Sequence, residues 1–402
     1  MLKPRIQWTF LALISSALAA APGVAATYSM MLDEDLFDES SVVARVKVLT
    51  VSPAPAVGTP STDYIVLVER VLKGRVSGTT VVVRVPGGVR PDGIGLAIHG
   101  APRFEEGDRA LLFLSPRSDG TYGVQQLMLG AFHELDWDGR RAALRRLEGA
   151  RLVGNEDFEE FEYVRDWNRF QEWLADRAGG VRREADYFSV ADSSESVSLP
   201  SLLKFRGTPI RFFEFDDGGK VVWEVGRGLK KAKKAFKRAA KTWNSDPDTV
   251  VNLAGRGRTS NQNGFVRSDG VNAIIFNDPN NEVQGVYSCT RGGVIALGGA
   301  WFFKSPAMVQ RIPKSIGKGK ANVAIEADVI TNDGAKCLLS GDLEATEQVL
   351  AHELGHTLGL GHSCGSGCTG RERKALMWAF FHDDGRGARL EAWDRQWLDK
   401  LY

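Results

Sequence analysis

The sequence predicts an α+β protein built from two unlike parts. Residues 27–136 are dominated by β-branched runs bounded by Pro and Gly clusters, which is typical of a small all-β domain. Residues 201–402 alternate strand-like runs with helical periodicity, which predicts a mixed sheet with three helices. A chain of 402 residues, 43% hydrophobic and 25% charged, is long enough to form two separate cores.

The N-terminus has the pattern of a signal for export. Lys3 and Arg5 precede an apolar run, Trp8 to Ala21, that is short for a membrane span and is followed by small residues. We expect residues 1–26 to be a signal peptide, with Ala17-Leu18-Ala19 offering an earlier cleavage site and an uncleaved anchor as the alternative. The protein is then expected to be exported, extracellular or periplasmic, without stable membrane insertion after cleavage.

The all-β region is expected to be a small barrel or a sandwich. Its clearest strand-like runs are Ser41 to Val48, Tyr64 to Val68 and Thr80 to Val85. The segments VERVLKG, PGG and EEGDRALLFL, in this order along the chain, resemble the small OB-like barrels of the netrin and metalloproteinase-inhibitor type.

A helical connector is expected over residues 137–178, with helices at 140–150 and 157–178. The second places an apolar stripe at helical spacing: Phe158, Phe161, Val164, Trp167, Phe170 and Leu174. Residues 179–200 are rich in serine and read as a flexible linker.

The elements expected after the linker alternate between strands and helices. Strands are predicted at 210–215, 249–253, 271–276, 294–303 and 321–331, and helices at 229–244, at 390–402 and after the capping residue Asp342. The lysine run from Lys230 to Lys241 alternates with apolar residues, so it is expected to be the solvated face of a helix. With a net charge of +1, nothing in the sequence indicates a nucleic-acid partner.

The segment AHELGHTLGLGHS, residues 351–363, contains the candidate metal ligands and the candidate catalytic base of the chain. On a helix, His352 and His356 lie roughly 40° apart around the axis and about 6 Å along it, so both can reach one ion. A helix continued to His362 would turn that residue roughly 240° away from His356 and carry it about 9 Å onward. We therefore expect the helix to stop at Gly359 so that the third imidazole can return to the metal.

Three neutral imidazoles would leave one zinc ion an open position for water, whose pKa the metal lowers to about 7. Glu353 follows the first ligand directly and can take the proton of that water. The alternative, a polar helix with incidental histidines, is disfavoured because Gly359 and His362 are both in place.

HELGHTLGLGHS, followed by Ala375-Leu376-Met377, resembles the metzincin zinc endopeptidases. Ser363 and the closing segment AWDRQWLDKLY are similar to the matrixin branch, here in a bacterial-type secreted form without a hemopexin domain. The resemblance implies a protein or peptide substrate, the three histidines as ligands, Glu353 as base and Met377 as the residue of the turn beneath the metal. One catalytic zinc is expected, because no histidine lies between His133 and His352 to hold a second.

The resemblance also implies that an extended peptide pairs with an edge strand beside the zinc, and Val294, Ile295, Ala296 and Leu297 are the candidate edge. A buried strand is the alternative for these residues. Latency in this family uses a propeptide cysteine, but no cysteine precedes Cys289. The front half would therefore inhibit through a carboxylate, through steric cover, or not at all.

The four cysteines all lie late in the chain. The short spacing of Cys364 and Cys368 favours a local loop disulfide, which leaves Cys289 to pair with Cys337; a thiolate metal site is the weaker alternative. Calcium is a further expectation of low weight, from the oxygen-rich turns at 278–282 and 332–334, which are also ordinary turn sequences.

The sequence thus predicts a secreted zinc endopeptidase. Two alternatives remain: a secreted binding or inhibitory protein whose β domain has the function, and a peptidase acting on cell-wall peptides. The natural substrate, the removal of the front half and the oligomeric state are not set by the sequence.

Overall fold

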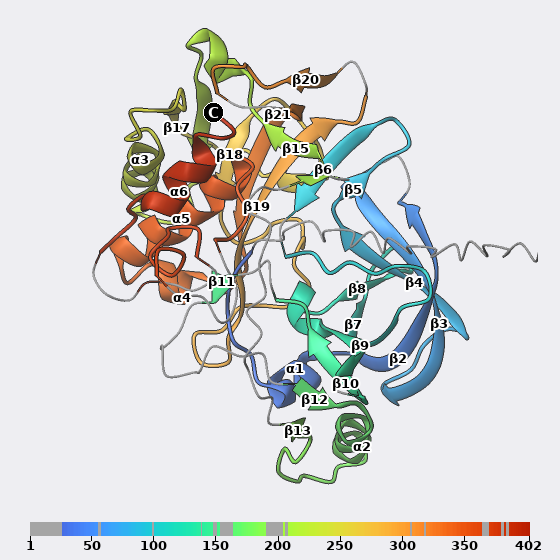
Figure 1. The fold of residues 1–402 in the computed structure, drawn as a ribbon. Helices are drawn as coiled ribbons and strands as arrows, with labels where there is room; N and C mark the ends of the chain where they lie inside the picture. Colours follow the sequence, from blue (N-terminus) through green and yellow to red (C-terminus); the bar gives the residue numbers. More distant parts are fainter. Residues whose placement is uncertain are drawn as a thin grey trace, which may run out of the picture.

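The computed structural model of the chain is shown in Figure 1. The residues described by the structure are 26–54, 58–98, 100–137, 139–147, 151–152, 164–189, 204–205, 208–305, 308–316, 319–363, 370–378, 382 and 386–402. The expected signal peptide up to Ala25 lies outside these residues, and so do Cys364 and Cys368. Among the described residues, no helix is long and apolar enough to cross a membrane.

The front half contains a closed β-barrel, which confirms that part of the prediction. Its strands are β2 (Val42–Pro53), β3 (Ser61–Lys73), β4 (Thr80–Pro86), β7 (Arg109–Pro116) and β8 (Tyr122–Val124). Neighbouring strands pair in the order β7-β2-β3-β4-β8, and β8 pairs again with β7, so the sheet closes on itself. Buried apolar residues of these strands contribute to the core: Val43, Val46, Val48, Val66, Val81, Val83 and Leu112.

The prediction of a helix over residues 140–150 is wrong. Residues Arg140–Arg145 form β10, which pairs antiparallel with β9 (Ala131–Trp137). Trp137 lies opposite Arg140 in the register, and the sequence between them is Asp-Gly, the pair favoured in two-residue hairpin turns. Gly139 has φ 72°, as such a turn requires, so the hairpin signal outweighs the helical periodicity.

Further elements extend the front half after this hairpin. β12 (Val164–Asp166) pairs with β10, and α2 (Trp167–Ala178) follows with the Asp166 carboxylate capping its start. β13 (Phe188–Ser189) pairs with β12, so residues 188–189 of the linker expected at 179–200 belong to the sheet of the front half. Residues 190–200 of that linker lie outside the described part.

The second half is a mixed sheet covered by helices. Its strands run in the order β19 (Gly293–Phe303), β21 (Lys320–Thr331), β18 (Asn272–Ile275), β16 (Val221–Val225) and β17 (Leu253–Arg258). β19 is antiparallel to β21, whereas the other neighbours are parallel. β16 was not expected from the sequence, and the strand expected at 249–253 starts only at Leu253.

Three helices of this half lie together beside the sheet in Figure 1: α3 (Ala232–Trp243), α5 (Leu343–Thr357) and α6 (Ala392–Leu398). α3 buries Phe236 and Trp243 and leaves its lysines exposed, which confirms the expected amphipathic face. Short elements complete the fold: α1 (Asp33–Glu39), α4 (Lys336–Leu339), β5 (Gly88–Val89), β11 (Arg151–Leu152), β14 (Lys204–Phe205), β15 (Thr208–Arg211) and β20 (Val309–Arg311).

The two halves share one sheet. β1 (Ala26–Ser29) and β6 (Ile94–Ile98), both from the front half, pair antiparallel with β19. The candidate edge residues Val294, Ile295, Ala296 and Leu297 therefore lie in a buried strand with neighbours on both sides, not at an open edge. The pairing could not be predicted from local sequence patterns, because β1 and β6 are distant in sequence from β19.

Candidate metal centre

The centre is built on helix α5. The Asp342 carboxylate caps its first turn by accepting a hydrogen bond from the backbone N–H of Glu344 at 2.8 Å. At its C-terminal end the helix carries His352, Glu353 and His356, and all three side chains are buried. The indole N–H of Trp243 on α3 donates to the backbone carbonyl of Ala351 at 2.8 Å, which fixes this end of the helix from outside.

The helix ends where the third histidine requires it to end. α5 stops at Thr357, and Gly359 has φ 93°, a left-handed conformation that glycine adopts at little cost. A Cβ added at Gly359 would lie 2.1 Å from the backbone oxygen of Ile210, so the turn also needs glycine for space. The chain then brings His362 back toward the helix.

The three imidazoles converge. The ring centroids are 4.4 Å apart for His352 and His356, 4.9 Å for His352 and His362, and 5.1 Å for His356 and His362. One ligand atom from each ring lies within 4.8 Å of the others, and among the described residues this is the one cluster of histidine, cysteine and acidic side chains arranged to hold a metal ion. Residues widely used as zinc ligands therefore meet at one point.

The hydrogen bonds of the rings orient them for a metal. Nδ1 of His352 lies 3.0 Å from the backbone oxygen of Leu376, and Nδ1 of His356 lies 2.9 Å from that of Leu360. A carbonyl oxygen can only accept, so these Nδ1 atoms carry the protons and the Nε2 lone pairs face the cluster. Two nitrogens about 2.0–2.1 Å from one tetrahedral zinc lie roughly 3.3 Å apart. The observed separation between Nε2 of His352 and Nε2 of His362 is 2.9 Å, so the residues fit zinc.

Met377 lies directly under the helix. A Cβ added at Gly355 would meet the Met377 sulfur at 2.3 Å, and the backbone N–H of Ser363 donates to the Met377 carbonyl at 2.8 Å. Asp394 on α6 holds this turn by accepting from the backbone N–H groups of Leu376 and Met377 at 2.8 and 2.9 Å. Burial raises the pKa of Asp394 to about 6, against the lowering effect of these backbone bonds. No pattern in the sequence distinguishes Asp394 from the other acids of the closing segment.

Glu353 lies between the helix and β19. A Cβ added at Gly298 of β19 would come within 2.7 Å of the Glu353 backbone oxygen and 3.1 Å of its side-chain Oε2, so the strand and the carboxylate are in close contact. The hydroxyl of Thr27, on β1, donates to Oε1 of Glu353 at 2.5 Å. Thr27 was not a candidate site residue, because 326 positions separate it from Glu353 and no local pattern marks it.

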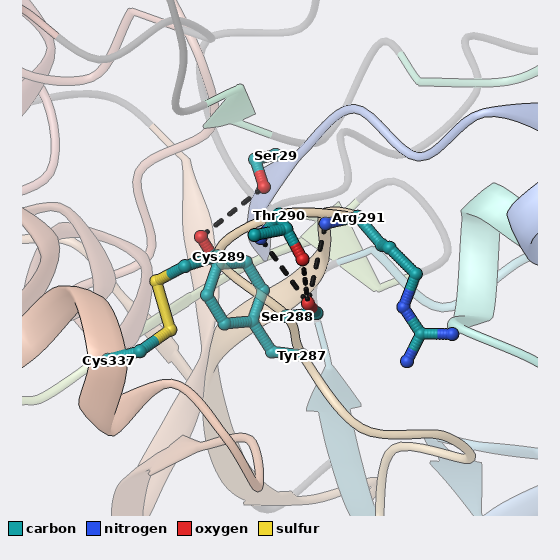
Figure 2. Close-up of a disulfide and its surroundings, with 7 residues drawn as sticks. All are labelled: Ser29, Tyr287, Ser288, Cys289, Thr290, Arg291 and Cys337. Atoms are coloured by element: carbon teal, nitrogen blue, oxygen red, sulfur yellow. Dashed lines mark hydrogen bonds between the residues drawn. A yellow bond between two sulfur atoms is a disulfide. The ribbon is translucent and has the colours of Figure 1, made fainter.

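The other candidate residues lie apart from the centre. Cys289 and Cys337 form a disulfide, as expected, and it fixes the loop shown in Figure 2. The calcium expectation finds no support among the described residues, because the Asp278 carboxylate accepts from the backbone N–H groups of Glu282 and Val283, as in an ordinary turn. His382, the remaining histidine near the C-terminus, is buried, and its Nε2 lies 2.9 Å from the Ala375 carbonyl oxygen.

A three-histidine centre with an adjacent buried glutamate is the arrangement of metal-dependent peptidases. Residues 229–402 match the model of the Peptidase_M10 family, Matrixin, which supports a matrixin-like metallopeptidase. No curated protein matches the chain. The matched residues include α3, the strands β17, β18, β19 and β21, and the helices α5 and α6, so the family match covers the metal centre and most of the sheet beside it.

Proposed function

We propose that this protein is an exported zinc-dependent endopeptidase. The observation that supports this function best is the convergence of His352, His356 and His362 beside the buried carboxylate of Glu353. Export is proposed from the charged and apolar pattern of residues 1–26.

Zinc held by the three imidazoles would supply a Lewis acid that polarises the scissile carbonyl and lowers the pKa of a water molecule. Glu353 has the role of general base: its carboxylate takes a proton from the attacking water and passes it to the leaving amine. The Leu376 and Leu360 carbonyls keep the rings of His352 and His356 in the tautomer that a ligand needs. Asp394 and Met377 keep the turn below the rings in place.

β19 is the proposed seat of the substrate backbone. It lies against Glu353 through Gly298, and its one neighbour within the second half, among the described residues, is β21. Its other side pairs with β1 and β6 of the front half. When these strands leave, its N–H and C=O groups would pair with an extended chain as an added strand. This places a substrate backbone directly beside the proposed base.

The test of this function is Glu353→Gln, with Glu347→Gln on the same helix as the matched control. We expect Glu353→Gln to lower kcat by roughly 10²–10⁴-fold on a fluorogenic peptide while the zinc content, measured by mass spectrometry, stays near one per chain. A chelator should abolish cleavage and added zinc should restore it. Cleavage that survives both the substitution and the chelator would overturn the assignment.

Assaying protein and cell-wall peptides in parallel distinguishes the two enzymatic alternatives. We expect the casein-type substrate to be cleaved, because pairing with β19 requires only an extended peptide with an ordinary backbone. Exclusive cleavage of the cell-wall peptide would favour the alternative.

A further inference from the structure

The side of β19 that faces away from β21 is covered along almost its whole length by strands of the front half of the same chain. β1 pairs antiparallel with it from Gly293 to Leu297, with Thr27 opposite Ala296. β6 continues the cover from Gly299 to Phe303, with Ile98 opposite Gly299. An incoming peptide therefore finds no free N–H and C=O row on this strand.

The same cover reaches the proposed base. The Thr27 hydroxyl donates to Oε1 of Glu353 at 2.5 Å, and Thr27 is fully buried. A hydroxyl that donates to a carboxylate stabilises its charged form and competes with any water for the same oxygen. β1 thus occupies the substrate seat and engages the side chain that the reaction needs.

The segment that follows β1 is fastened at both of its sides. On the front half, the buried Asp33 carboxylate accepts from Arg145, from Arg165 at 2.6 Å and from the Tyr187 hydroxyl at 3.0 Å. On the second half, the loop fixed by the Cys289–Cys337 disulfide touches the segment, because the Ser29 hydroxyl donates to the Tyr287 hydroxyl at 3.4 Å. Figure 2 shows these residues together.

The contact between this loop and the segment is close. A Cβ added at Gly292 would lie 2.1 Å from the backbone oxygen of Met30. Gln126 of the front half also reaches across, because its side-chain oxygen accepts from the backbone N–H of Val294 at 2.9 Å. The segment is therefore clamped between the two halves instead of lying loosely over the site.

We propose that residues 27–29 of β1, which remain after the expected cleavage behind Ala26, are a built-in inhibitor of the peptidase, which holds the site closed by occupying β19 and by bonding Glu353 through Thr27. This inference rests on the proposed function and adds its regulation. The chain as described is the closed form, and a substrate binds only in the fraction of molecules in which β1 has left β19. The apparent affinity for any ligand of the site is reduced by that fraction.

The first test removes the hydroxyl and keeps the shape. In the full zinc-loaded chain, Thr27→Val deletes the bond to Glu353, and Thr80→Val, an exposed strand position on β4, is the matched control. We expect Thr27→Val to bind a peptide hydroxamate roughly tenfold or more tightly than the parent, and to cleave a fluorogenic peptide correspondingly faster. Thr80→Val should behave as the parent.

The second test displaces the segment that follows β1 by adding a methyl group to the loop of the second half that contacts it. Gly292→Ala places a methyl group against the Met30 carbonyl, whereas Gly218→Ala, at φ 74° with nothing within 4 Å of the added carbon, carries the same backbone strain without the contact. We expect hydrogen exchange of the amides at 293–297 to accelerate in Gly292→Ala and not in Gly218→Ala. This measurement needs neither zinc nor activity.

The outcomes separate this proposal from the proposed function. A parent that binds the hydroxamate and cleaves as well as Thr27→Val and Gly292→Ala would overturn self-inhibition and leave the peptidase assignment intact. Variants whose β19 amides exchange faster but which never cleave any peptide would overturn the proposed peptidase function. The conclusion that β1 can leave β19 would then still hold. Tighter binding in Gly292→Ala alone would show that the strand blocks the seat, and would refute the part assigned to the Thr27 hydroxyl.

Discussion

Buried polar side chains determine where the segments of this chain meet. The Asp394 carboxylate accepts hydrogen bonds from the backbone N–H groups of Leu376, Met377 and Glu391. It thereby joins α6 to the turn under the metal centre. Asp33 plays the matching part in the front half, where it faces two guanidinium groups. Each carboxylate is buried, so removing its partners or its charge leaves an unsatisfied group in the interior.

Asp33 predicts how stability depends on pH. Burial by itself raises the pKa of Asp33, but the charges of Arg165 and Arg145 and the hydrogen bonds from Arg165 and Tyr187 bring the pKa below its ordinary value. A lowered pKa in the folded state means that the stabilisation is present above the unfolded pKa of about 3.9 and is lost as the pH falls further. We expect Asp33→Asn to lower the free energy of unfolding by about 3–5 kcal/mol at pH 7 and to flatten its decline below pH 4.

Urea unfolding at a series of pH values checks this prediction. Asp35→Asn, on the same helix and partly exposed, is the control and should keep the profile of the parent. A variant at Asp33 that unfolds at the urea concentration of the parent at every pH would mean that the buried cluster contributes nothing net.

At the scale of elements, local patterns predicted what depends on local spacing. The histidine spacing, the Asp342 cap and the glycine that ends the helix all lie within residues 342–362, so one periodicity argument reaches them. The helix predicted over 140–150 was wrong because the short apolar run from Ala142 to Leu144 fits a helix or a strand, and the Asp-Gly pair before it favours a hairpin. Thr27 could not be predicted at all, because its role comes from strand pairing between distant segments.

The end of α5 gives a prediction for an element. Gly359→Ala would force a Cβ to within 2.1 Å of the Ile210 oxygen and 2.9 Å of a Leu401 methyl carbon, at a φ that alanine adopts only with strain. We expect the turn to open, His362 to leave the cluster and the zinc affinity to fall at least tenfold, together with a loss of stability of roughly 1–3 kcal/mol from backbone strain alone. Metal content after dialysis against a graded chelator is the measurement, and Gly218→Ala controls for the strain. Parental zinc retention would show that the third ligand tolerates another path of the chain.

At the scale of the whole molecule, the front half is joined to the second half through the strand that a substrate would use. The 12-stranded sheet runs from β11 and β1 across β19 and β21 to β17, so the two halves are continuous in their hydrogen bonding. The sequence predicts two separate domains because each half has its own pattern of elements. Strand pairing between halves leaves little trace in composition, which is why the covered state of β19 appears only in the structure.

Removing the Cys289–Cys337 disulfide tests how firmly the loop of the second half holds the segment of the front half that follows β1. Cys289 and Cys337 are 48 positions apart, and a cross-link closing a loop of that length stabilises a folded chain by about 4 kcal/mol through the entropy of the unfolded state. We expect the double variant Cys289→Ser and Cys337→Ser to lose roughly 2–4 kcal/mol in urea unfolding. Because the loop it frees contacts Ser29 and Met30, the variant should also cleave a fluorogenic peptide faster than the parent under conditions where both are folded. A variant that is less stable yet no faster would show that the clamp on β1 depends on the Asp33 cluster of the front half and not on this loop.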